Sequence, residues 1–320
     1  MPRATFNAAA VLPPLLGAGL LAVLAAKLLS ADNLGDLAAA LATARCAGSF
    51  GAALLIAVAF NLLLGAYKWR LIFSFSRVAD LGFGTCLKLW LACGAFDLIA
   101  PAGSGKLLAA VQLERARGIP FSKTASTLVI KKYLNLLATA LIVAVAGSLH
   151  LFGSAADPLH GAIVAAALAA ILILALGRPL ARVVGARLLP RGRSGAFLGN
   201  LTLGFSIPPV ASAVLLALSV VTQLARIGCA WLVFSGLGLP VSGATLAFLY
   251  PVVAALSALP LTPAGLGVRE ALVVALFASA ADGHLFLAGG LALSLIETVL
   301  PALAGIIVLQ VRGRELLSRP

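Results

Sequence analysis

The stretch LPLTPAGLGVRE, residues 259–270, interrupts an apolar region with two prolines and two glycines. A related stretch, IAPAGSG at residues 99–105, interrupts an earlier apolar region. Because Pro and Gly break helices, we expect each broken region, 83–117 and 243–282, to form two short helices around a turn. Non-helical backbone inside a bilayer must be surrounded by protein or by a water-filled cavity. The two regions therefore predict a pair of re-entrant helical hairpins.

The composition around these stretches is that of a polytopic membrane protein. Of the 320 residues, 62% are hydrophobic and only 10% are charged, whereas soluble domains carry about a quarter charged residues. This excludes a soluble globular enzyme, a secreted disulfide scaffold and a disordered protein. Apolar segments of spanning length are predicted at 8–29, 50–67, 124–149, 159–176, 210–237 and 285–309. We expect the first to be a retained helix rather than a cleaved signal.

The basic residues predict the topology. The net charge of +13 comes from 23 Lys and Arg against 10 Asp and Glu, and the basic residues cluster after certain spans, as Lys68, Arg70 and Arg77 do after 50–67. Six spans plus two hairpins that re-emerge on their own side put every cluster on one side of the membrane. The positive-inside tendency makes that side the cytoplasm, with both termini there, in a bacterial-type inner membrane. The basic charge thus needs no nucleic-acid partner.

The two broken regions also predict an inverted repeat. They share P-A-G-x-G at an offset of 162 residues, which also pairs Trp69 with Trp231, both interpreted as interface anchors. Three predicted spans separate the motifs, so the hairpins enter from opposite sides. The predicted fold class is an all-α polytopic membrane protein, a single domain over 1–320 with halves at about 50–176 and 210–310 and the helix 8–29 additional. Many transporters use such repeats to place a site at the bilayer midplane.

Charged residues inside the predicted spans and hairpins are the candidate site, because intramembrane charges are costly. A half-helix that begins after P-A-G-x-G offers free backbone N–H groups and a positive dipole end, which suit an anionic head such as a phosphate. The predicted substrate-binding residues are Pro101, Gly103, Gly105, Lys106, Lys131, Lys132, Arg226, Pro263, Gly265, Gly267, Arg269, Glu270 and Glu297. Asp97 and Glu297 are the predicted proton carriers.

Structural alternatives exist for several of these residues. Lys106 and Arg269 could snorkel to an interface from shallow hairpins. Glu270 could neutralise Arg269 or cap the half-helix. Lys131 and Lys132 could be ordinary interfacial lysines.

Motifs for soluble enzyme chemistry were not found. The sequence has no G-x-S-x-G, no H-E-x-x-H and no G-x-x-x-x-G-K motif, so no catalytic residue is assigned. Its four cysteines lie in apolar surroundings without C-x-x-C spacing, and its three histidines lie far apart. No cofactor and no metal are expected.

The motifs together resemble those of the lysylphosphatidylglycerol synthase transmembrane family, the flippase-like integral membrane proteins. Residues 259–270 carry the resemblance, with support from 99–105, from Lys68-Trp69-Arg70, and from Pro301 and Gly305. The resemblance implies a stand-alone member without the aminoacyl-transferase domain that some members carry, and a function in moving lipids. Stand-alone members are associated with glycolipid, polyprenyl-phosphate or hopanoid pathways.

The chain departs from the family pattern in its charges. The family often has Gly-Glu where this chain has Gly105-Lys106, and an Arg where this chain has Glu297. Glu297 is the best candidate partner for a Lys or Arg in the cavity. The more specific hypothesis is that the cavity keeps its charge pairing with the signs exchanged, Glu297 pairing with Lys106, Lys131 or Lys132.

The predicted function is a lipid translocator for an anionic or amphiphilic lipid, phospholipid, polyprenyl-phosphate-linked or hopanoid-type, with lipid-biosynthesis enzymes as possible partners. An integral-membrane enzyme or accessory subunit of lipid biosynthesis and a small-solute transporter stay open as alternatives.

Overall fold

The computed structural model describes residues 44–99, 104–153, 158–187, 207–259, 262, 264–277 and 283–317, and every regular element in these ranges is a helix. Five continuous helical segments in the described ranges are long and apolar enough to cross a membrane. They are Cys46–Phe75, Phe121–His150, Pro158–Leu176, Pro209–Gly236 and Gly283–Val311. These agree with five of the six spans predicted from hydropathy. The sixth, 8–29, lies outside the described residues.

Two of the five segments contain a π-helical turn. The first comprises α3 (Ala44–Ile56), η1 (Ala57–Leu63) and α4 (Leu64–Phe75). The last comprises α13 (Gly283–Ser294), η3 (Leu295–Val299) and α14 (Leu300–Leu317). The two π-helical turns contact each other. Since π-helical turns are rare and are frequent at functional sites, their meeting marks the interior of the molecule as a candidate site.

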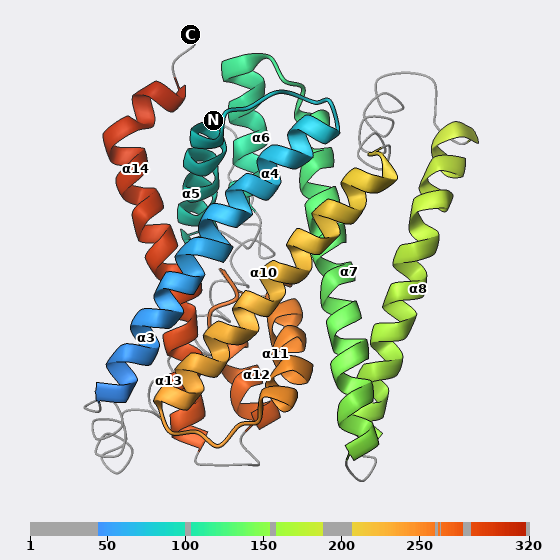
Figure 1. Ribbon diagram of the computed structural model, residues 1–320. Coiled ribbons are helices and arrows are strands. Elements are labelled where there is room, and N and C mark those ends of the chain that lie inside the picture. The colour runs from blue at the N-terminus through green and yellow to red at the C-terminus, as the bar shows by residue number, and fades with distance from the viewer. Residues whose placement is uncertain are drawn as a thin grey trace, which may run out of the picture.

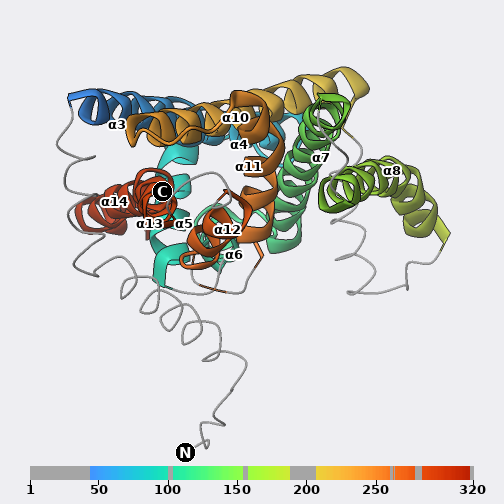
Figure 2. The same cartoon turned by 90° about the horizontal axis from the view of Figure 1, so that it is seen from below.

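The other three segments are uninterrupted helices. They are α7 (Phe121–Gly153), α8 (Pro158–Arg187) and α10 (Pro209–Gly236). Helix α10 packs on α3 and α7, whereas α8 lies at the edge of the bundle against α7 (Figure 2). The lipid-facing character of α8 agrees with this position, because its Leu168, Leu172 and Ile173 are exposed.

The first broken region forms two short helices that pack on each other. Helix α5 (Phe83–Ile99) and helix α6 (Ser104–Arg117) lie in the upper half of the molecule (Figure 1). Their close approach requires a glycine, because a Cβ at Gly105 would lie 2.1 Å from the Cys93 carbonyl oxygen. Helix α14 approaches α5 in the same way at Gly305, where a Cβ would lie 2.1 Å from the Leu91 carbonyl oxygen.

The second broken region forms helix α11 (Gly243–Ser257) and helix α12 (Val268–Phe277) in the lower half of the molecule (Figure 1). The Ser242 hydroxyl caps α11 by accepting a hydrogen bond from the Thr245 amide at 3.1 Å. Between the two helices the backbone turns through positive φ at Ala264 (52°), Gly265 (74°) and Gly267 (85°). Glycine explains two of these positions, and Ala264 holds a conformation that costs an alanine about 1 kcal/mol or more.

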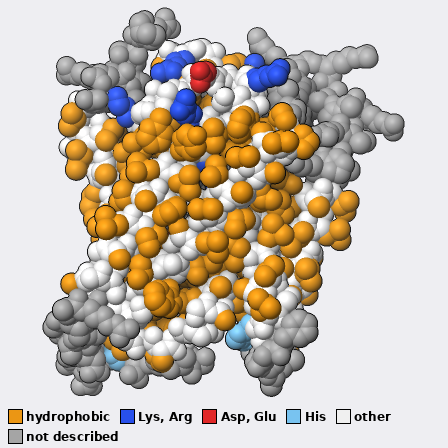
Figure 3. All heavy atoms as spheres, viewed as in Figure 1, with side chains coloured by type: hydrophobic (Ala, Val, Ile, Leu, Met, Phe, Trp, Pro, Cys, Tyr) orange, Lys and Arg blue, Asp and Glu red, His pale blue; other side chains and the backbone are white. Residues whose placement is uncertain are grey.

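The surface has an apolar band and one basic end. Hydrophobic side chains cover most of the face in Figure 3, and the Lys and Arg side chains gather at the upper end. The basic residues Arg77, Arg115 and Arg117 are exposed, next to the ends of α4 and α6. Such a distribution is typical of a bilayer-embedded protein with one basic side.

Candidate functional site

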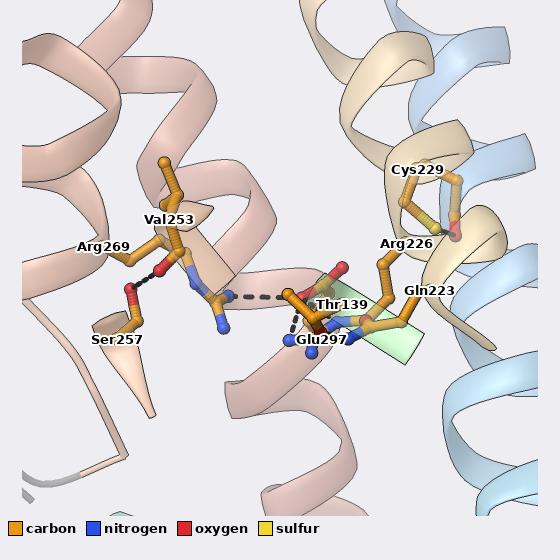
Figure 4. Close-up of polar contacts among 9 residues, drawn as sticks. Thr139, Gln223, Arg226, Cys229, Val253, Ser257, Arg269 and Glu297 are labelled. Atoms are coloured by element: carbon orange, nitrogen blue, oxygen red, sulfur yellow. Dashed lines mark hydrogen bonds and ion pairs between the residues drawn. The ribbon is translucent and has the colours of Figure 1, made fainter. Parts of the chain in front are cut away.

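Glu297 of η3 lies between two arginines from different helices (Figure 4). Its Oε2 accepts hydrogen bonds from Arg226 Nε at 3.3 Å and Nη2 at 3.0 Å, and lies 3.6 Å from Arg269 Nη1. The Glu297 and Arg269 side chains are 2% and 7% exposed, and that of Arg226 is 26% exposed. One carboxylate faces two guanidinium groups, so the group keeps a positive charge that an anion would compensate.

The prediction that the charge of Glu297 pairs with Lys106, Lys131 or Lys132 is wrong. The partners are Arg226 from α10 and Arg269 from α12, which the chain crossings bring to η3. We call Arg226, Arg269 and Glu297 the arginine–glutamate cluster.

Several polar atoms around this cluster are buried without a hydrogen-bond partner among the described residues. They are Tyr250 Oη, Arg269 Nη1, Glu270 Oε1, Ser294 Oγ and Glu297 Oε1. Buried polar atoms are normally satisfied, because leaving one unsatisfied costs about 1–3 kcal/mol. Donors and acceptors are both present in this set. The site is therefore suited to a polar group that both donates and accepts hydrogen bonds.

Glu270 caps the start of α12. Its Oε2 accepts a hydrogen bond from the Gly267 amide at 2.7 Å, and its side chain is fully buried. The sequence left two structural roles open for Glu270, neutralising Arg269 and capping the half-helix. The hydrogen bond to Gly267 supports the capping role. A carboxylate in the first helical turn also interacts favourably with the helix dipole.

The equivalent start of α6 is occupied by a carboxylate from the neighbouring helix. Asp97 accepts hydrogen bonds from the Gly105 amide and from Lys106 Nζ, both at 2.9 Å. Lys106 is 38% exposed on its side chain and Asp97 is 14% exposed. The predicted electropositive N-termini are thus both partly neutralised by the protein's own carboxylates, Asp97 in the first half and Glu270 in the second.

Lys131 and Lys132 occupy different environments although they are adjacent on α7. Lys131 is buried and donates a hydrogen bond to the Gly65 carbonyl at 3.2 Å, with its Nζ 3.1 Å from the centroid of the Trp90 ring. Lys132 is exposed and donates to the Ala258 carbonyl at 3.4 Å, just beyond the end of α11. Lys131 is therefore not an interfacial lysine.

Two residues at the end of the predicted span 50–67 are buried rather than interfacial. Lys68, grouped above with the basic residues that follow this span, is 1% exposed, because the helix continues to Phe75. Trp69, interpreted above as an interface anchor, is also fully buried, and its Nε1 donates to Thr127 Oγ1 at 3.1 Å. Trp231, its counterpart at the offset of 162, is 49% exposed.

Sequence reasoning selected Lys131 on α7 and Arg226 on α10, but it missed the polar residues that extend from them along these helices. The two lines are Lys131, Asn135 and Thr139 on α7, and Ser219, Gln223 and Arg226 on α10. Hydrogen bonds from Lys68 Nζ to Asn135 Oδ1 at 2.6 Å and to Ser219 Oγ at 3.1 Å connect the lines, as does a hydrogen bond from Gln223 to Thr139. Their spacing of three or four residues on apolar helices was the available signal.

Some predicted site residues lie outside the described residues, namely Pro101, Gly103 and Pro263. Of the described glycines, Gly105 permits the contact between α5 and α6, whereas Gly265 and Gly267 permit the turn before α12. A Cβ at Gly265 would lie 2.4 Å from the Ser257 carbonyl oxygen.

The residues of the site have the chemistry to bind an anion. Within the described ranges, no group of three or more metal-ligating side chains comes together. The arginine–glutamate cluster offers fixed positive charge and unsatisfied hydrogen-bonding atoms in a protein interior, a combination that recognises a polar anion.

Comparison with known proteins agrees with this environment. The family described as the lysylphosphatidylglycerol synthase TM region matches residues 11–305. A search of the curated proteins gives no match. The family match covers four of the five apolar segments, the fifth as far as residue 305, and the arginine–glutamate cluster. The chain is an integral membrane protein that belongs to the lysylphosphatidylglycerol synthase transmembrane family.

Proposed function

We propose that this protein is a lipid translocator, which moves an anionic or amphiphilic lipid between the two leaflets of the membrane. The observation that carries the proposal is the arginine–glutamate cluster, in which one carboxylate faces two guanidinium groups inside an apolar bundle. Membership of the family supports a lipid-related function. The lipid head would enter the cluster while its chains stay in the bilayer.

The buried polar atoms beside the cluster support a head group as the occupant. Tyr250 and Arg269 offer donors, and Glu270 and Glu297 offer acceptor oxygens. A lipid head that leaves water loses its hydration, and these atoms would replace part of it. The unsatisfied groups of the site and the desolvated head thus compensate each other.

The proposal includes an architecture of six spans and two re-entrant hairpins in an inverted repeat. The positions of α5 with α6 in one half and of α11 with α12 in the other support it (Figure 1). The basic end supports an orientation with that end in the cytoplasm of an inner membrane, where both termini would also lie (Figure 3). Relative movement of the halves would expose the cluster to each side in turn.

The energy source in this proposal is either the lipid gradient itself or an ion gradient. Asp97 and Glu297 are the proposed proton carriers, and each lies in an ion pair that a proton would weaken. The anionic lipid is the proposed partner, together with enzymes of lipid biosynthesis.

The test is a leaflet-transfer assay in proteoliposomes that contain fluorescently labelled phosphatidylglycerol. Dithionite bleaches only the label in the outer leaflet, so a translocator increases the bleached fraction. The informative variant is Arg226→Gln with Arg269→Gln and Glu297→Gln, since removing the three charges of the cluster together leaves none of these three buried and unpaired. We expect transfer by the unmodified protein and none by the triple variant.

The matched control is Arg115→Gln, which removes an exposed arginine at the basic end and should transfer lipid normally. Unmodified protein that bleaches no more label than empty vesicles would refute the proposal. A chemically altered lipid in those vesicles would favour an enzyme, and solute uptake that ignores lipid identity would favour a solute transporter.

A further inference from the structure

Two buried lysines lie in the interior without a carboxylate partner among the described residues. In the part of the chain that the structure describes, Lys68 and Lys131 are 1% and 6% exposed and neither makes an ion pair. Lys68 donates to the neutral side chains of Asn135 and Ser219. Lys131 donates to the Gly65 carbonyl.

The surroundings of both lysines suit the charged ammonium form. Lys131 Nζ lies 3.1 Å from the ring centroid of Trp90 and 5.9 Å from that of Trp69, which is the geometry of a cation–π contact. Lys68 Nζ lies 2.6 Å from Asn135 Oδ1, a separation typical of a charge-assisted hydrogen bond. With an anion bound beside it as counter-charge, each lysine would therefore carry a positive charge in the interior.

These lysines connect to the arginine–glutamate cluster through the polar line on α10. Lys68 contacts Ser219, and Arg226 lies seven residues further along the same helix, on the same face. Seven residues rise about 10 Å along a helix, a separation that the long side chains of Lys68 and Arg226 shorten. One elongated basic site thus runs from α7 to η3.

The buried charges of this site do not balance. Its cations are Lys68, Lys131, Arg226 and Arg269, and its carboxylates are Glu270 and Glu297. When both lysines are protonated, two positive charges are left without a counter-charge among the described residues, because the nearby pair of Lys106 and Asp97 is neutral by itself. An uncompensated buried charge is strongly unfavourable, so a ligand that supplied two negative charges would stabilise the site.

We propose that the site is selective for a lipid head with two negative charges. This inference rests on the proposed function, since it assumes that the site receives a lipid head. A phosphomonoester, which carries about −1.5 to −2 at neutral pH, has this chemistry. A phosphodiester head such as that of phosphatidylglycerol carries one negative charge and leaves the other cation unbalanced.

The experiment compares lipids with identical acyl chains in phosphatidylcholine nanodiscs that hold the unmodified protein. Dioleoyl phosphatidic acid and dioleoyl phosphatidylglycerol are added in equal amounts, and native mass spectrometry measures which lipid is retained. At pH 7.5 we expect retention of phosphatidic acid to exceed that of phosphatidylglycerol by about tenfold, equivalent to about 1.4 kcal/mol.

The informative variant combines Lys68→Met with Lys131→Met, which keeps side-chain length and removes both charges. We expect it to retain both anionic lipids equally, because the preference depends on the charges of these two lysines. The matched control is Lys123→Met, a partly exposed lysine at the start of α7, which should keep the preference of the unmodified protein.

Acidification provides a test that does not depend on the folding of a variant. The second pKa of a phosphomonoester is about 6, so phosphatidic acid becomes a monoanion at pH 5 and its advantage should disappear. Equal retention of the two lipids at pH 7.5, or a preference that survives pH 5 or the double substitution, would overturn the inference. Retention of neither anionic lipid above phosphatidylcholine would overturn the proposed function as well.

Discussion

Glu297→Gln should destabilise the folded protein, because it leaves two buried guanidinium groups facing each other. At 3.0 Å from Arg226 and 3.6 Å from Arg269, each attraction has a gross value of about 5 kcal/mol at an effective dielectric constant near 20. Desolvation offsets much of this gross energy, and breaking a buried pair costs about 3–5 kcal/mol. Since Arg226 is 26% exposed, we expect the lower end, about 3 kcal/mol.

A double-mutant cycle isolates the contribution of the pair. Arg226→Gln with Glu297→Gln should be more stable than the two single changes predict, by about 2 kcal/mol, because neither charge is left alone. The cycle that combines Arg269→Gln with Glu297→Gln should give a smaller coupling energy, since the contact between Arg269 and Glu297 is longer and lacks a hydrogen bond.

The measurement is reversible unfolding of the protein in mixed micelles, followed by tryptophan fluorescence. Interhelical hydrogen bonds in membrane proteins average about 0.6 kcal/mol in such cycles. A coupling no larger than this average between Arg226 and Glu297 would show that the ion pair contributes little. The reasoning from buried charge would then be wrong.

Two further changes test the packing, with thermal unfolding as the measurement for both. Gly105→Ala should prevent normal folding, because its Cβ would lie 2.1 Å from the Cys93 carbonyl oxygen. The control Gly48→Ala should be tolerated, because a Cβ there would meet no atom within 4 Å. An unchanged unfolding temperature for Gly105→Ala would contradict the contact between α5 and α6. Trp69→Phe should lower the free energy of unfolding by about 2 kcal/mol, since it removes a buried hydrogen bond and leaves a cavity. The control Trp231→Phe, at a half-exposed position, should change that free energy little. Equal effects of the two substitutions would disprove their different environments.

Hydropathy predicted the helices well because the bilayer imposes their length and composition. Five predicted spans lie within helices of the structure, and the prolines and glycines at 99–105 and 259–270 separate short helices as expected. Helix ends were less predictable. Lys68 follows an apolar run and resembles the start of a basic loop, but α4 continues for seven more residues and buries it.

The charge partners could not be predicted, because they depend on how helices distant in sequence cross. Arg226 and Glu297 were each expected to lie inside, but 71 residues separate them and nothing local pairs them. The capping role of Glu270, by contrast, depends on residues within one turn, and the sequence had offered it as an alternative.

The π-helical turn that carries Glu297 has a consequence for the angular alignment of the last membrane segment. Such a turn holds an extra residue, and one residue of an α-helix corresponds to a rotation of about 100°. The extra residue therefore sets the rotational phase between Glu297, which faces the arginines, and Gly305, which fits against α5. Deleting one residue from Leu295–Val299 would restore a regular helix and turn one of these faces away from its partner. The pairing of Glu297 with the arginines and the packing of α14 on α5 thus depend on the same local irregularity.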